Sequence, residues 1–367
     1  MIIYIGSILF SALSLFRANS ATIQHIYDPT LSPNEAIGLL HQEALIEGGE
    51  LIVYSGGDGS NSSLDLTRRF NQRFPGMNLT LMVNLSKHHN IEIDDQLANG
   101  TLIPSVAHLQ TVNDFYRWKD EGRLLPFKPP HWDQVYPEIK DPEYHFTSLN
   151  IISFSPNALA CDYENGNAPV EDLDFLDPKY KNRIVMTYPN DDDAVLYQFD
   201  KIISKYGWQY VEKLVAQNVT WVRGTGTPLV MINNGTISNG VTFTSGNSLA
   251  PAPDARVVAR YPTKSWFLTW GQTAAIFRDA PHPAAAKLFI AWYLSDEVQN
   301  SNSVQWSSRM DIPPKNGFKQ VQDYPNTSPR DFITFMLNRP HVEYLRFRFE
   351  RLIGTPQGQS PLLDPNQ

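Results

Sequence analysis

Residues 50–70 read ELIVYSGGDGSNSSLDLTRRF, and this stretch decides the fold of the chain. Residues 51–54 are apolar and partly branched at Cβ, which is typical of a buried strand. Glycines then break the run, and apolar residues return at every fourth position, which predicts a helix. A strand, a glycine loop and a helix in this order expose N–H groups where a carboxylate or phosphate can bind. The alternative is that the glycines only form a tight turn.

Strands and helices alternate on both sides of this stretch. The sequence from Ser32 to Glu35 is a capping box that starts a helix before the first strand. The alternation restarts near residue 150. In the whole chain, the strands expected after residue 54 cover residues 79–83, 105–109, 149–154, 183–186, 219–222, 241–244 and 257–261. Expected helices cover residues 64–74, 91–97, 115–121, 191–206, 210–216, 283–294 and 296–306. Two α/β units joined near residues 150 and 262 predict two lobes connected by two crossings.

Composition narrows the class of protein. The chain has 367 residues, of which 42% are hydrophobic and 19% charged, and its net charge is −8. Lys and Arg do not cluster, so we expect no nucleic-acid partner. Residues 2–16 form an apolar run followed by small residues at 18 and 20, which predicts a signal peptide over residues 1–20. An uncleaved anchor is the alternative, and no later segment is apolar for long enough to span a membrane.

A signal peptide implies export, so the cysteine content and the glycosylation sequons of the chain become informative. The only cysteine, Cys161, has no partner for an internal disulfide, and we interpret it as a buried structural thiol. Seven N-x-S/T sequons follow the signal run, more than the composition predicts, which favours a eukaryotic secretory route. The seven acceptor residues are Asn61, Asn78, Asn84, Asn99, Asn218, Asn234 and Asn326.

Four segments carry a resemblance to a known family. They are ELIVYSGGDGS, PSVAHLQTVNDFYRWKDEGRLLPF, FLDPKYKNRIVMTYPNDDDAVLYQF and TAAIFRDAPHPAAAKLFIAWYLSDEVQ. Over residues 48–310 the chain resembles the extracellular solute-binding proteins of bacterial ABC importers, on the ferric-iron branch. It resembles most closely the fungal secreted relatives of that group, which lack an obvious importer partner.

The resemblance implies an α/β, two-lobed periplasmic-binding-protein-like fold of type II, with a cleft between the lobes. The expected division is residues 21–148 for the first part of lobe 1, residues 149–266 for lobe 2, and residues 267–367 for the return to lobe 1 and the C-terminal helices. Iron-binding members carry adjacent tyrosines where this chain has Thr244-Ser245-Gly246, which argues against capture of iron by tyrosinates. We expect no metal ion and no cofactor.

Candidate ligand contacts come from loops that follow strands. The run Asp191-Asp192-Asp193 opens a helix after a buried strand, so these carboxylates either face the cleft or only cap the helix. Arg223 ends a strand in a glycine loop, where it would clamp an anionic group or form a surface ion pair. The complete set of expected ligand contacts is Ser55, Gly57, Asp58, Gln110, Tyr188, Asn190, Asp191, Asp192, Arg223, Thr244 and Trp270.

The sequence therefore predicts a secreted, monomeric solute-binding protein without catalytic residues. Its expected ligand is a small polar molecule such as a phosphorylated sugar, an amino acid or another zwitterion. One alternative is a hydrolase or lyase on the same cleft, with Asp191 or Asp192 as general base and Arg223 as electrostatic stabiliser. The other is a surface interaction protein with a vestigial cleft. No common catalytic motif is present to favour an enzyme.

Overall fold

The computed structural model describes residues 25–26, 30–59, 64–246, 249, 254–301 and 306–363. The predicted signal peptide and the sequon at Asn61 lie outside these residues. The helices are α1 (Pro33–Ile46), α2 (Leu64–Arg73), α3 (Ser86–Asn99), α4 (Val112–Asp120), α5 (Ala160–Glu164), α6 (Asp193–Tyr206), α7 (Trp208–Val215), α8 (Thr227–Asn233), α9 (Pro283–Tyr293), α10 (Asp296–Ser301), α11 (Pro329–Leu337) and α12 (Arg339–Ile353). The strands are β1 (His25–Ile26), β2 (Glu50–Gly56), β3 (Asn78–Asn84), β4 (Val106–Leu109), β5 (Leu124–Leu125), β6 (Phe127–Lys128), β7 (Thr147–Phe154), β8 (Asn157–Leu159), β9 (Val185–Thr187), β10 (Thr220–Val222), β11 (Val257–Ala259), β12 (Leu268–Phe277) and β13 (Trp306–Ser307).

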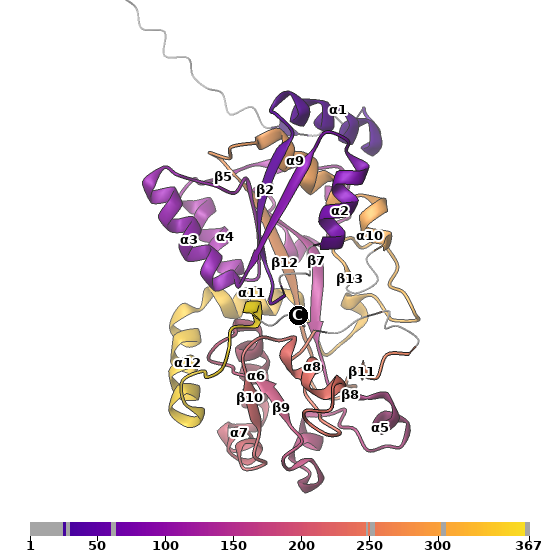
Figure 1. The fold of residues 1–367 in the computed structure, drawn as a ribbon, viewed down its shortest axis with the longest axis vertical. Coiled ribbons are helices and arrows are strands. Elements are labelled where there is room, and N and C mark those ends of the chain that lie inside the picture. Colours follow the sequence, from indigo (N-terminus) through magenta and orange to yellow (C-terminus); the bar gives the residue numbers. More distant parts are fainter. Residues whose placement is uncertain are drawn as a thin grey trace, which may run out of the picture.

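The first lobe is built on a seven-stranded sheet with the order β13-β7-β12-β4-β2-β3, and β5 pairs with β12. Strand β2 is parallel to β3 and β4, whereas β12 is antiparallel to β4 and β7. Helices cover both faces of this sheet, with α1, α2 and α9 grouped apart from α3 and α4 (Figure 1). Phe70, Phe289 and Trp292 pack in the core on one side, and Phe115 and Trp118 pack in a separate core. The strand and helix alternation predicted for residues 50–121 is therefore confirmed.

The second lobe has a smaller sheet and a large aromatic core. Strands β9 and β10 are parallel, and β8 and β11 are antiparallel. The strand predicted at residues 241–244 is reduced to bridges, in which Val241 pairs with Ile184 and Thr242 with Asn157. These bridges join the two strand pairs. The apolar side of α6, which includes the fully buried Phe199, packs into the core.

Strands β7 and β12 connect the lobes. Trp270, near the start of β12, packs in the core of the second lobe, whereas Ile276 near its end packs in the first. Likewise Phe154 ends β7 in the second-lobe core and Leu149 lies in the first-lobe core. These two strands form an antiparallel pair that runs from one core to the other (Figure 1), and the crossings near residues 150 and 262 stay a prediction.

The C-terminal helices pack differently from the expected division of the chain. The sequence groups residues 267–367 with lobe 1, but α12 packs on α6 (Figure 1). Phe332, Val342 and Phe349 are buried in the core that contains Phe199. The reason is that the apolar side of α12 completes the aromatic cluster around α6, a match of surfaces that chain order does not reveal. The exact boundaries between the lobes stay a prediction.

Several local expectations need correction. Cys161 is exposed, so its interpretation as a buried thiol is wrong. Its position near the start of the short helix α5 leaves the side chain outside the core. Helix α4 begins at Val112, earlier than the expected start at residue 115, and the side chain of its N-cap residue Thr111 makes no capping hydrogen bond. Helix α10 ends at Ser301, and Trp306 lies in a strand instead.

The sequons differ in accessibility. Asn78, Asn99, Asn218 and Asn234 are exposed, and Asn84 is partly exposed. The side-chain amide of Asn326 donates hydrogen bonds of 2.9 and 2.6 Å to the carbonyls of Pro262 and Ser265, so it is already engaged. None of the described helices combines the length and apolar character needed to cross a bilayer.

Candidate ligand site

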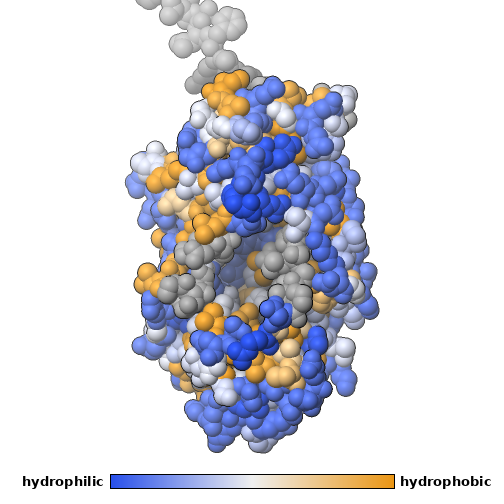
Figure 2. All heavy atoms as spheres, turned by 45° about the vertical axis from the view of Figure 1, so that its right-hand side comes forward, coloured by the Kyte–Doolittle hydropathy of each residue, from blue (hydrophilic) through white to orange (hydrophobic). Residues whose placement is uncertain are grey.

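A cavity with a volume of about 660 Å³ lies between the two lobes. Figure 2 shows the hollow from one side of the molecule. Both lobes and both crossing strands contribute to its lining. The first lobe contributes Gly56, Gly57, Asp58, Gly59, Leu85, Ser86, Lys87, Gln110 and Thr111; the crossing strands contribute Ile152, Phe154, Trp270 and Gln272; and the second lobe contributes Asn157, Asp191, Asp192, Asp193, Thr225, Gly226, Leu229, Val230, Gly246, Val257, Val258 and Ala259. Its volume lies within the range of small-molecule sites.

The glycine loop after β2 is shaped by a close approach. A Cβ atom on Gly56 would lie 2.1 Å from the Ser86 side-chain oxygen, which is closer than real contacts allow. That oxygen accepts a hydrogen bond of 2.9 Å from the backbone N–H of Gln110. Gly56 therefore lets the starts of α3 and α4 close around the end of β2. Gly56 is therefore required for close packing, and this role does not depend on whether a ligand binds in the cavity.

Replacement of Gly56 by alanine is expected to lower the free energy of unfolding by about 1–3 kcal/mol, because the added methyl group displaces Ser86. Chemical denaturation measures this change. Gly38→Ala is the control, since a Cβ at this helical position meets nothing within 4 Å. It is expected to raise stability by about 0.4–1 kcal/mol. Equal effects of the two substitutions would contradict the packing role of Gly56.

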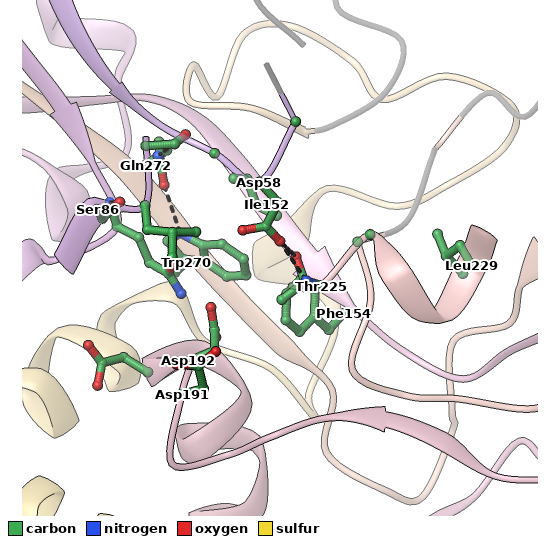
Figure 3. A pocket seen from close by; sticks show the side chains of 18 of the residues that line it. Asp58, Ser86, Ile152, Phe154, Asp191, Asp192, Thr225, Leu229, Trp270 and Gln272 are labelled. Carbon is green, nitrogen blue, oxygen red and sulfur yellow. Dashed lines mark hydrogen bonds between the residues drawn. The ribbon is translucent and has the colours of Figure 1, made fainter. Parts of the chain in front are cut away.

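An apolar wall follows the crossing strands. Trp270 is 4% exposed, and its ring meets that of Phe154 edge to face, with the centroids 5.1 Å apart. The indole N–H of Trp270 donates a hydrogen bond of 3.1 Å to Gln272, which fixes the ring (Figure 3). Ile152 adds a branched side chain to the same wall. This side of the cavity suits the hydrocarbon part of a ligand.

Two carboxylates enter the cavity from opposite lobes. Asp58 accepts hydrogen bonds of 2.5 and 2.7 Å from the backbone N–H and hydroxyl of Thr225 (Figure 3). Asp192 caps α6 by accepting a hydrogen bond of 2.9 Å from Val195. Burial, and then repulsion from Asp58, raise the pKa of Asp192 to about 7. The cavity is therefore a place where negative charge is poorly solvated.

Asp191 is held by two cations. Lys87 donates hydrogen bonds of 2.6 Å to its backbone oxygen and 2.5 Å to its carboxylate. Arg223 donates one of 2.9 Å to the other carboxylate oxygen. Burial alone would raise the pKa of Asp191, but the hydrogen bonds from Arg223 and Lys87 outweigh this effect and lower it. Asp191 is therefore an ionised anchor between the lobes, with its charge already compensated.

Removing the contacts between the lobes is expected to open the cleft. The double substitution Lys87→Ala and Thr225→Val removes one cation from Asp191 and one hydrogen bond from Asp58. Small-angle scattering should then show a larger radius of gyration than for the unaltered protein. Lys119→Ala is the control, because Lys119 pairs with Asp141 on the same lobe. An unchanged radius in the double variant would show that other contacts set the closure.

The structure brings six of the expected ligand contacts into the cavity lining, namely Gly57, Asp58, Gln110, Asp191, Asp192 and Trp270. Ser55 lies one residue before the lining, within β2. Tyr188 is buried near Trp221, with ring centroids 6.0 Å apart. Thr244 is buried, and its hydroxyl accepts a hydrogen bond of 2.9 Å from the Thr187 N–H. These three residues are not part of the lining, because their strands or packing direct them elsewhere, and their contact with a ligand stays a prediction.

Asn190 and Arg223 also lie outside this lining. They border a second cavity together with residues of α12 and the following segment. Asn190 donates a hydrogen bond of 3.0 Å to the carbonyl of Gly354. Arg223 pairs with Asp191, which matches the ion-pair alternative stated from the sequence and not the clamp on an anionic group.

Some lining residues were missed by the sequence reasoning. Ser86 and Lys87 begin α3 directly after β3, so the strand-to-helix position was a usable signal. Thr225 lies in the same glycine loop as Arg223, but its hydroxyl contacts the opposite lobe. Ile152 and Gln272 lie on the crossing strands, where the sequence gives no indication of which side chains face the cavity.

Comparisons with known proteins agree with this architecture. Residues 171–300 match the family model described as bacterial extracellular solute-binding protein. No curated protein sequence matches the chain. A substrate-binding protein of an ABC transporter from Agrobacterium tumefaciens is 13% identical, with a TM-score of 0.69 over 83% of this chain and 94% of that one.

Two further solved structures are similar. The periplasmic binding protein AfuA from Actinobacillus pleuropneumoniae, solved with fructose-6-phosphate, is 17% identical, with a TM-score of 0.66 over 83% of this chain and 98% of that one. Iron-bound HitA from Pseudomonas aeruginosa is 16% identical, with a TM-score of 0.64 over 82% of this chain and 99% of that one. The chain therefore has the two-lobed α/β fold of periplasmic binding proteins, as the resemblance implied.

Proposed function

We propose that this chain is a solute-binding protein that captures a small polar ligand between its lobes without changing it chemically. The observation that carries the proposal is the cavity of about 660 Å³ lined from both lobes and from both crossing strands. A ligand placed there contacts both lobes at once, so its binding energy favours the closed arrangement. The similar structures solved with iron or fructose-6-phosphate support this use of the fold.

The contacts of Asp191 speak against its use as the general base of the enzyme alternative, and Asp192, the other candidate base, already uses one carboxylate oxygen to cap α6. A general base needs an accessible lone pair, and both carboxylate oxygens of Asp191 already accept hydrogen bonds from cations. Arg223 borders the second cavity, so it is absent from the place where a stabiliser of developing charge would act. The proposal therefore assigns no catalytic residue.

The proposal also includes secretion as a glycosylated monomer, in a fungal setting. The apolar run at residues 2–16 and the excess of sequons support export through a eukaryotic secretory route. The resemblance to secreted fungal relatives supports the source. Mass spectrometry of the protein from culture medium tests this part, with Ala21 as the expected first residue.

Native mass spectrometry of the purified protein tests ligand capture. We expect a mass excess that disappears on denaturation and belongs to one small molecule. Returning that molecule to stripped protein should raise the melting temperature, because a ligand at a hundred times its Kd adds about 2.7 kcal/mol of stability. Product formation during prolonged incubation would favour the enzyme. If no small molecule is retained and no metabolite extract raises the melting temperature, the proposal is wrong.

A further inference from the structure

The two carboxylates in the cavity lack a cationic partner within the described part of the chain. Among the described residues, the Asp58 carboxylate accepts hydrogen bonds from Thr225 alone, and the Asp192 carboxylate accepts one from the Val195 N–H that it caps. Neither carboxylate belongs to an ion pair with a described side chain. Two like charges that face one enclosed space repel one another, and a bound positive charge relieves this repulsion.

The other charges around the cavity are already compensated. Among the described lining residues, Lys87 is the single cation, and it is engaged by Asp191. Asp193 forms an ion pair with Arg346. After these pairs are accounted for, Asp58 and Asp192 remain without a paired cation. Because Asp191 is shared by Lys87 and Arg223, the four carboxylates and three cations leave a net charge of −1. A phosphate or carboxylate ligand would meet no uncommitted cation among these residues, whereas an ammonium group would meet two acceptors.

The rest of the lining separates an organic cation from a metal ion. Three possible metal ligands converge in the described chain at Asp141, Glu143 and His145, outside this cavity. The lysine Lys119 already contacts two of them, at 2.6 and 2.8 Å. Within the cavity, no group of three such ligands is found among the described residues. A metal ion would also gain nothing from an apolar wall.

The apolar wall and one buried hydrogen-bond donor indicate what else the ligand should contain besides a positive charge. Ile152, Phe154 and Trp270 offer a hydrocarbon surface of ring faces and edges (Figure 3). The side-chain N–H group of Gln110 borders the cavity and has no partner within the described structure. It is free to donate to an oxygen of the ligand, since a buried amide donor without a partner is costly.

We propose that the cleft selects an organic amine, with its ammonium group between Asp58 and Asp192 and its hydrocarbon body against Trp270, Phe154 and Ile152. This inference rests on the proposed function and names its ligand class. Among the ligands expected from the sequence, it favours those with an ammonium group over a phosphorylated sugar, because Arg223 is paired with Asp191.

Calorimetric titration with three matched probes tests the ligand class. The probes are 2-phenylethylamine, 2-phenylethanol and 3-phenylpropanoate, which share an aromatic body and differ in charge. Glucose-6-phosphate and Mg²⁺ are added as separate probes. We expect the amine to bind at least about tenfold more tightly than the alcohol, and the carboxylate more weakly than either, as charge complementarity requires.

Variants then assign the binding to the two carboxylates. Asp192→Ser removes the charge but keeps an oxygen that caps α6. Asp58→Asn removes the charge on the other lobe. Each is expected to weaken amine binding at least about tenfold and to leave alcohol binding unchanged. Asp331→Asn is the control, because Asp331 pairs with Lys201 away from the cavity. Thermal unfolding of every variant checks that it is folded.

The outcomes separate this inference from the proposed function. Tight binding of the phosphate, the carboxylate or Mg²⁺ in place of the amine would overturn the amine assignment and leave solute binding intact. Amine binding that survives both substitutions would overturn the role of Asp58 and Asp192. If none of the probes binds and native mass spectrometry finds no retained molecule, both proposals fail together.

Discussion

Replacement of Phe349 by alanine is expected to lower the free energy of unfolding by about 3–5 kcal/mol. Phe349 is fully buried, although it lies on the last long helix of the chain. Its ring contacts those of Phe199 and Trp208, with centroids 5.2 and 5.1 Å apart. Removing it leaves a cavity among aromatic rings that cannot collapse to fill the space. Urea denaturation with a fluorescence readout measures the loss.

Phe347→Ala on the same helix is the matched control. The side chain of Phe347 is 66% exposed, so its removal is expected to change the free energy of unfolding by less than about 0.5 kcal/mol. Similar losses for the two variants would mean that the helix, and not the buried ring, carries the effect. A negligible loss for Phe349→Ala would contradict the packing of α12 on the second lobe.

Asp172→Asn is expected to stabilise the protein above neutral pH. Burial raises the pKa of Asp172 to about 7, while Ser265 and Lys205 lower it and Glu171 and Asp174 raise it further. The folded state therefore holds a proton on Asp172 that the unfolded state releases above about pH 4. Stability falls as pH rises from about 4 to 7, and the cost reaches about 4 kcal/mol at pH 8.

Asparagine cannot ionise, so the variant lacks this cost. We expect equal stabilities near pH 4 and a difference that grows to about 4 kcal/mol by pH 8, measured by chemical denaturation at fixed pH values. Asp279→Asn, at an exposed position, is the control and should follow the unaltered protein. A difference that does not depend on pH would show that the pKa of Asp172 is the same in the folded and unfolded states.

The fold was largely predictable because its signals are local. In residues 50–74, an apolar run predicts a strand, glycines predict a turn, and a spacing of four predicts a helix. Each signal depends only on neighbouring residues, and β2 and α2 form where these signals predict them. The strand expected at residues 241–244 is reduced to bridges. Its extent depends on pairing partners that lie far away in the sequence, and the local pattern does not reveal them. The packing of α12 was not predictable for the same reason.

The position of a site residue was predictable only where the place of its loop in the fold determines which way the side chain points. Asp58 and Asp192 follow strands whose carboxyl ends meet at the cleft, and both residues line the cavity there, while their contact with a ligand stays a prediction. The direction of Arg223 depends on Asp191, which competes with any ligand for its guanidinium group. The sequence offers both interpretations and cannot weigh them, because the outcome depends on the distance between two loops.

The crossing strand β12 has a consequence for biosynthesis. Gln272 of β12 contacts the backbone of His108 in β4, 164 residues earlier in the chain. As the chain leaves the ribosome, the edge of β4 that will pair with β12 therefore stays unpaired while the whole second α/β unit is translated. That unit in turn lacks Phe332 and Phe349 until the last helices emerge. The first lobe therefore cannot finish folding until β12 emerges, and the second lobe cannot finish until the last helices emerge, so we expect protection by chaperones to matter most during this interval.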